Sequence, residues 1–158
     1  MMSFWTFSDV FEEGGPPSTP FTGAFGLRAM GGINKPSYYG YGLLHQLGNT
    51  RLPVQSEDAI ATKTAEGKIA VALWNLVDPD KHGGPKTVTV QFRGVAPNAQ
   101  VSIQRVDETH GNVLPRYAAM GKPKIPTLEQ IERLNRDTAL PAPERMRLGS
   151  GKIGRAHV

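Results

Sequence analysis

The stretch SFWTFSD, residues 3–9, is the part of this 158-residue chain that most constrains its fold. Aromatic residues and small residues with β-propensity fill it, and this pattern predicts one buried β-strand. A long connection rich in glycine and proline follows over residues 10–33 and carries three phenylalanines. Loops of this length without structure of their own are uncommon, so we expect a folded, packed loop.

A helix is predicted directly after this loop. Asn34 is suited to the N-cap, Pro36 falls in the first turn, and Gly48 supplies a C-terminal stop. The apolar stripe of this helix, at spacings of four residues, consists of Tyr39, Leu43 and Leu47. Residues 1–50 therefore read as strand, loop and helix. This is one β/α unit, and such a unit cannot close a core alone.

The character of the chain changes after about Arg51. Short β-type segments follow at residues 59–64, 69–77, 86–93 and 100–107, separated by turns with proline, asparagine or glycine. The continuous apolar run at 69–77 predicts a central strand buried on both faces, and the clean alternation at 86–93 predicts a half-buried one. Together these segments predict a mainly β second domain over residues 51–152, built as an antiparallel β-sandwich.

One short helix is expected inside this second domain. Thr127 and Gln130 fit a capping box, and the helix is predicted over residues 127–137. Its apolar face would consist of Leu128, Ile131 and Leu134. Two prolines then end it, and no periodicity is visible in the rest of the chain.

Composition excludes several classes of protein. There is no cysteine, so neither a disulfide framework nor a thiolate metal site is possible. Residues 101–158 hold ten Lys/Arg against six Asp/Glu, which accounts for the whole excess of +4, but the charges are spread out. Nucleic-acid binding is not expected, because it favours a clustered basic stripe. No apolar run approaches the roughly 20 residues of a membrane span, so a soluble protein of undetermined compartment is expected.

The strongest candidate site lies where the first predicted strand ends. Trp5 could stack on a sugar ring, and Asp9, Glu12 and Glu13 could accept hydrogen bonds from its hydroxyls. From the residues alone a structural role is favoured, with Trp5 in a core and the acids in a solvated loop. Glu12 and Glu13 are rejected as a catalytic pair, because neighbouring side chains on extended backbone point to opposite sides. Retaining glycosidases need two carboxyls about 5–5.5 Å apart that face each other.

No metal or cofactor site is expected. The four histidines show no ligand spacing on one element and are interpreted as solvated or hydrogen-bonded structural residues; they are His45, His82, His110 and His157. The paired glycines match no phosphate-binding pattern and indicate turns instead.

Three runs of residues together resemble glycoside hydrolase family 39. They are SFWTFSDVFEE at 3–13, the segment 21–26, and GINKP at 32–36. The resemblance is closest to the bacterial β-xylosidases, and the iduronidase branch departs from this pattern. It implies a (β/α)8 barrel followed by a β-sandwich. Since such barrels take about 250 residues, residues 1–50 would be the eighth strand, its loop and the eighth helix of a truncated barrel.

The resemblance also implies roles for particular residues. Trp5, Glu12 and Glu13 would bind the sugar next to the cleaved bond, and Asp9 and Phe11 would support the loop. The family's acid/base follows the fourth strand in an Asn-Glu-Pro motif, and its nucleophile follows the seventh strand. This sequence contains no Asn-Glu-Pro. Both catalytic glutamates are therefore expected upstream of Met1, and the chain alone is expected to be inactive.

The expected function is that of a fragment of a retaining β-xylosidase acting on xylose-containing carbohydrate. The alternative is a non-catalytic β-sandwich module that binds carbohydrate or a protein partner; the oligomeric state is left open. The last residues, 153–158, can be encoded by ATC GGA AGA GCA CAC GTC, a common sequencing-library adapter. We therefore expect residues 153–158 to be adapter read-through, and the true sequence beyond about Gly151 is left open.

Overall fold

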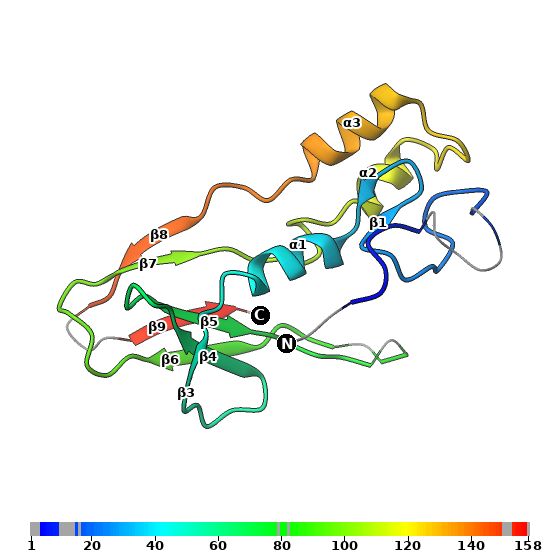
Figure 1. Cartoon of the computed structure of the whole chain (residues 1–158). Coiled ribbons are helices and arrows are strands. Elements are labelled where there is room, and N and C mark those ends of the chain that lie inside the picture. Colours follow the sequence, from blue (N-terminus) through cyan, green and yellow to red (C-terminus); the bar gives the residue numbers. More distant parts are fainter. Residues whose placement is uncertain are drawn as a thin grey trace. The chain divides into compact units, whose positions relative to one another are not determined.

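The structure is a computed structural model that describes residues 4–9, 15, 17–78, 80–81 and 83–149, together with the backbone of 153–157. It is made mostly of short strands with few helices (Figure 1). The chain divides into two compact units. The first consists of Met1–Gly42 and Gln104–Ala142, and the second of Leu43–Ile103 and Pro143–Val158.

The first unit holds a small hairpin and the three helices. Strands β1 (Arg28–Ala29) and β2 (Ile33–Asn34) pair antiparallel around a turn at Gly31 and Gly32, both of which have positive φ. Helix α1 runs over Pro36–Leu44 and crosses into the second unit at its end. Helices α2 (Leu114–Ala119) and α3 (Leu128–Asp137) complete the unit. A side chain at Gly31 would clash with Ile131 of α3, so this glycine also allows close packing.

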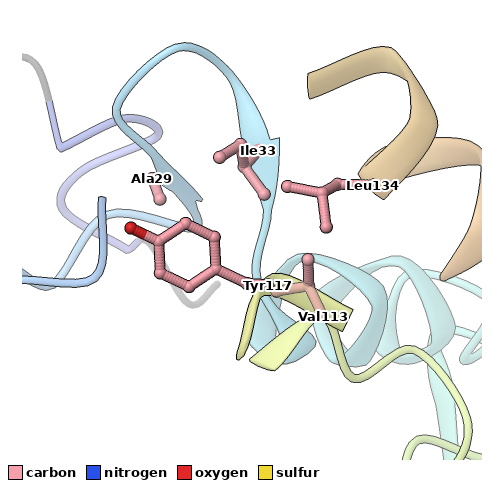
Figure 2. Packing of buried hydrophobic residues seen from close by; sticks show 5 residues of the cluster. All are labelled: Ala29, Ile33, Val113, Tyr117 and Leu134. Carbon is pink, nitrogen blue, oxygen red and sulfur yellow. The ribbon is translucent and has the colours of Figure 1, made fainter. Parts of the chain in front are cut away.

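Five apolar side chains form the core of the first unit, and Figure 2 shows them converging from the hairpin, the α2 segment and α3. They are Ala29, Ile33, Val113, Tyr117 and Leu134. Phe21 packs edge-on against Tyr117, with 4.9 Å between ring centroids. The long glycine- and proline-rich loop thus contributes to the core through Phe21, as its phenylalanines predicted, whereas Phe25 is exposed.

The second unit contains antiparallel strand pairs. One sheet has the order β3-β4-β5, formed by Thr50–Leu52, Ala59–Lys63 and Ile69–Leu73. Strand β6 (Thr87–Gln91) pairs with β9 (Ile153–His157), and β7 (Gln100–Ile103) pairs with β8 (Glu144–Arg147). The alternation predicted for 86–93 is confirmed in β6, where Val88 and Val90 are half-buried between exposed neighbours.

Several predictions about elements are confirmed. Helix α1 begins at Pro36, and α3 begins after Thr127 with a complete capping box: Thr127 Oγ1 accepts from the Gln130 amide, and Gln130 Oε1 accepts from the Thr127 amide. Within the described residues no helix has the length and apolar character needed to cross a bilayer.

The prediction of a buried strand at residues 3–9 is wrong for the described residues 4–9. Phe4, Trp5 and Phe7 are exposed, and this segment forms only an isolated parallel bridge, between Ser8 and Arg28. A buried strand needs hydrogen-bonding neighbours along both edges and cover on its faces. The backbone hydrogen bonds that this segment forms with residues 27–28 provide such a neighbour along one edge.

The prediction for residues 69–77 is also wrong in part. The strand β5 exists, but it lies at the edge of its sheet, and the central strand is β4, where Ala59 and Thr62 are buried. Ile69 and Leu76 are exposed. A continuous apolar run is equally compatible with an edge strand whose outer face is only partly covered, so periodicity alone could not place it.

The helix at 127–137 was assigned to the second domain, and the structure corrects this. Leu134 of α3 is buried against Ile33, and α3 packs on β2, so this helix belongs to the first unit. Leu128, predicted on the apolar face, is 71 % exposed, because the helix begins there and only its later turns reach the core.

Candidate functional site

The candidate site is built around residues 4–9, which carry Trp5 and Asp9 and are called the Trp5 segment below. This segment runs beside residues 27–28 and exchanges three backbone hydrogen bonds with them. The Leu27 amide donates to Thr6 O (3.2 Å), the Arg28 amide to Phe7 O (3.0 Å), and the Asp9 amide to Arg28 O (2.9 Å). These bonds fix the register of the Trp5 segment against the hairpin.

Asp9 is the most deeply buried polar residue of this region, with 1 % of its surface exposed. Its Oδ1 accepts hydrogen bonds from the Gly26 amide at 2.8 Å and from Lys35 Nζ at 2.7 Å. Lys35 Nζ also donates to the carbonyl of Ala24 at 2.6 Å. One carboxylate and one ammonium therefore connect the residues at both ends of the 10–25 loop with the start of α1.

Gly26 is required where it stands. A Cβ atom built there would lie 2.5 Å from both the amide nitrogen and Oδ1 of Asp9, which no real Cβ contact tolerates. The absence of a side chain lets the carboxylate reach the Gly26 amide directly. This glycine serves close approach, because its φ is not in the left-handed region.

Next to this ion pair lies a cluster of two aromatic rings and a guanidinium. Arg28 Cζ is 5.9 Å from the ring centroid of Phe7 and 6.0 Å from that of Tyr38. The two rings are edge-on to each other at 6.3 Å, and Arg28 Nη2 donates to the carbonyl of Gly32. A guanidinium over ring faces is attracted by their quadrupoles, so the cluster adds to the attachment of Phe7.

The site residues predicted from the sequence lie in different environments, and some of them are outside the described residues. Trp5 is 66 % exposed and is therefore not part of a buried core. Asp9 lies at the base of the loop in a structural ion pair, which is consistent with a supporting role. Phe11, Glu12 and Glu13 lie outside the described residues, and their predicted contacts with a sugar stay predictions.

Three residues of this arrangement were missed by sequence reasoning. Lys35 was interpreted only as part of a helix start, and Gly26 and Arg28 only as loop residues. The signal for Lys35 was present, since a lysine between Asn34 and Pro36 sits where a helix begins and α-helix N-termini disfavour cations. A cation at such a place indicates a specific partner, and here that partner is Asp9.

The described residues contain no group of histidines and acids able to hold a metal ion. His110 instead belongs to a local turn, where its Nδ1 lies 2.8 Å from Asp107 Oδ1. Burial would raise the pKa of Asp107, but hydrogen bonds from Thr109 and His110 outweigh this and lower its pKa to about 2. His82 and the side chain of His157 lie outside the described parts.

Comparison with known proteins assigns the class. The family model of glycosyl hydrolases family 39 matches residues 1–150. This covers nearly the whole chain, and the chain therefore belongs to glycosyl hydrolases family 39.

Two curated relatives specify the branch that it resembles. The chain is 36 % identical over 132 residues to a β-xylosidase of Geobacillus stearothermophilus, and 34 % identical over 137 residues to one of Caldicellulosiruptor saccharolyticus. Each match covers 84 % of this chain but only 26 % and 28 % of the respective relative. The chain thus spans about a quarter of the length of these enzymes.

Solved structures agree with this relationship. A family 39 β-xylosidase from Caulobacter crescentus matches with a TM-score of 0.76 and 28 % identity, over 98 % of this chain and 32 % of its own. A family 39 enzyme from Xanthomonas axonopodis pv. citri matches with a TM-score of 0.75 and 27 % identity, over 99 % of this chain and 34 % of its own.

Proposed function

We propose that this chain is part of a retaining glycoside hydrolase that cleaves β-xylosides. The observation that carries the proposal is the match to two β-xylosidases, each over 84 % of the chain. Residues 1–50 would supply the last segment of a (β/α)8 barrel, with its loop and helix, and the second unit would form most of a β-sandwich. Active sites of such barrels lie at the carboxyl ends of the strands, where the loop after Asp9 would begin.

Within the pocket the chain would bind substrate rather than carry out the chemistry. Trp5 would form an apolar wall against a xylose ring, and Glu12 and Glu13 would accept hydrogen bonds from its hydroxyls. The exposure of the Trp5 indole and the short distance along the chain from Asp9 to the two glutamates support this assignment. The substrate is therefore a xylose-containing carbohydrate, and no cofactor is needed for this chemistry.

The catalytic pair would come from another part of the intact enzyme. In a retaining mechanism one carboxylic acid protonates the leaving oxygen while a carboxylate attacks the sugar and forms a glycosyl-enzyme, which water then hydrolyses. This sequence lacks the Asn-Glu-Pro motif of the family, and Glu12 and Glu13 are adjacent. We therefore assign both catalytic glutamates to sequence outside these 158 residues.

The assay for this assignment is hydrolysis of 4-nitrophenyl β-D-xyloside by the purified 158-residue chain. We expect no turnover above the buffer rate, with the β-xylosidase of Geobacillus stearothermophilus as the active reference. Hydrolysis that copurifies with the chain and is lost in a Glu12→Gln or Glu13→Gln variant would contradict the assignment. Xyloside binding that does not depend on Trp5, Glu12 or Glu13 would favour a β-sandwich binding module instead.

A further inference from the structure

We propose that Asp9 and Lys35 are a positioning pair that holds the Trp5 segment in its place as a wall of the sugar pocket. This inference rests on the proposed function, because it takes Trp5 as a pocket residue. It adds two residues that act through Trp5 and do not themselves touch the sugar.

The first step is the contrast in burial along the segment. Trp5 and Phe7 are 66 % and 57 % exposed, whereas Asp9, two residues further on, is 1 % exposed. Exposed aromatic contacts, such as Phe4 with Tyr41 at 4.9 Å, hold a segment only weakly. Beside the three backbone hydrogen bonds to residues 27–28, the buried carboxylate of Asp9 is therefore the firmest side-chain attachment of the described residues 4–9.

The second step is the dependence of that attachment on Lys35. A buried carboxylate is stable only when its charge is compensated. Asp9 Oδ1 has two donors, the Gly26 amide and Lys35 Nζ, while Oδ2 is buried and has no hydrogen-bond partner among the described residues. Lys35, whose side chain is 14 % exposed, provides the compensating charge of the ion pair.

The third step is connectivity. Lys35 Nζ joins Asp9 to the Ala24 carbonyl, and the Asp9 amide donates to Arg28 O. Three separate segments thus meet at one ion pair: the Trp5 segment, the end of the loop, and the residue before α1. Because Trp5 lies four residues before Asp9, at most about 14 Å of extended chain separates it from this anchor. Loosening the pair should therefore loosen Trp5.

The test uses the full 158-residue chain with Trp74→Phe, which leaves Trp5 as its sole tryptophan. In Lys35→Met we expect a lower fluorescence anisotropy of Trp5, and about tenfold faster amide exchange in peptides covering residues 4–9 and 24–28. Exchange in α3 and β4 should not change. Lys35→Arg, which keeps the charge, should recover most of the anisotropy.

The matched control is Lys81→Met. Lys81 forms an ion pair of similar length with Asp78, at 2.6 Å, but both side chains are largely exposed. This variant should leave Trp5 anisotropy and exchange at residues 4–9 unchanged. Equal effects of Lys35→Met and Lys81→Met, or no effect of either, would overturn the positioning pair.

Lys35→Met leaves a buried carboxylate uncompensated and could prevent folding. The double variant Asp9→Asn/Lys35→Met removes both charges and keeps an acceptor for the Gly26 amide, so it should fold. Since the link to Ala24 is still lost, its Trp5 anisotropy should stay below that of the parent. Parental anisotropy in the folded double variant would overturn the proposal.

Titration with methyl β-D-xyloside separates this inference from the proposed function. The parent should show a change in Trp5 emission that saturates, and Lys35→Met should need a several-fold higher concentration. If the parent gives no response, the proposed sugar pocket is contradicted and the pair loses its role in binding. If both respond at the same concentration, the pocket stands and the positioning pair is overturned.

Discussion

Asn135 of α3 binds the backbone of Asn34, although 101 residues of sequence separate them. Its Oδ1 accepts from the Asn34 amide at 2.8 Å, and its Nδ2 donates to the Gly32 carbonyl at 2.9 Å. One amide side chain thus satisfies a donor and an acceptor of the β1–β2 hairpin. This contact, with Leu134 beside it, joins α3 to the N-terminal part of the chain.

Asn135→Ala should therefore destabilise the first unit. It leaves the part-buried Asn34 amide without this acceptor, and such a loss costs about 1–3 kcal/mol. Urea unfolding followed by circular dichroism measures the change. Glu132→Ala, at an exposed position on the same helix, is the control and should change the free energy of unfolding by no more than about 0.5 kcal/mol. Equal losses in both variants would contradict this account of the contact.

Leu134→Ala tests the core of the same unit. Leu134 is 1 % exposed, and truncation of a buried leucine to alanine costs about 2–5 kcal/mol. Leu128→Ala removes the same atoms from an exposed position on the same helix and should change the free energy of unfolding by no more than about 0.5 kcal/mol. A similar loss in the free energy of unfolding at both positions would contradict the packing of α3 on the β1–β2 hairpin.

The fold was predictable from sequence where its signals are local. The capping box at Thr127 and Gln130 and the alternation around Val88 and Val90 each lie within a few residues, and both elements were found. The hairpin strands β1 and β2 have two residues each, too few for any period to show. The membership of α3 depends on contacts over about a hundred residues of sequence, which no local pattern contains.

The candidate site was predictable to a similar extent. Trp5 and Asp9 were selected by residue type and by their place in a predicted strand, although the described residues 4–9 do not form that strand. Gly26 acts by having no side chain next to Asp9, and Lys35 acts through a partner 26 residues away. Both roles arise from tertiary contacts, and for this reason they were found only in the structure.

Gly26→Ala tests the close approach at Asp9. The added methyl would meet the Asp9 backbone, which cannot move away as a flexible side chain could, so we expect a loss of about 1–3 kcal/mol on unfolding. Gly40→Ala is the matched control, because nothing lies within 4 Å of its Cβ position and it stands inside α1. Alanine in a helix interior should stabilise by about 0.5–1 kcal/mol. Thermal melts that fail to separate the two variants would refute the clash.

The turn at Asp107 predicts a pH dependence. Its pKa is lowered from 3.8 to about 2 in the folded chain, so the unfolded chain binds this proton more tightly. The carboxylate therefore stabilises the fold above about pH 4, and this contribution is lost as the pH falls towards about 2. The stability difference between the parent and Asp107→Asn should shrink over that range. A difference that stays constant from about pH 6 to about pH 2 would contradict this assignment.

The central claim is that this chain supplies substrate contacts, but not the catalytic pair, to a family 39 β-xylosidase. The most direct measurement is the kcat/KM for 4-nitrophenyl β-D-xyloside of a chimera. In it, residues 1–150 replace the aligned segment of the Geobacillus stearothermophilus enzyme. We predict an active chimera in which Trp5→Ala lowers kcat/KM by about 10- to 100-fold and Trp74→Phe does not change it. A folded chimera without activity, or one indifferent to Trp5→Ala, would contradict the claim.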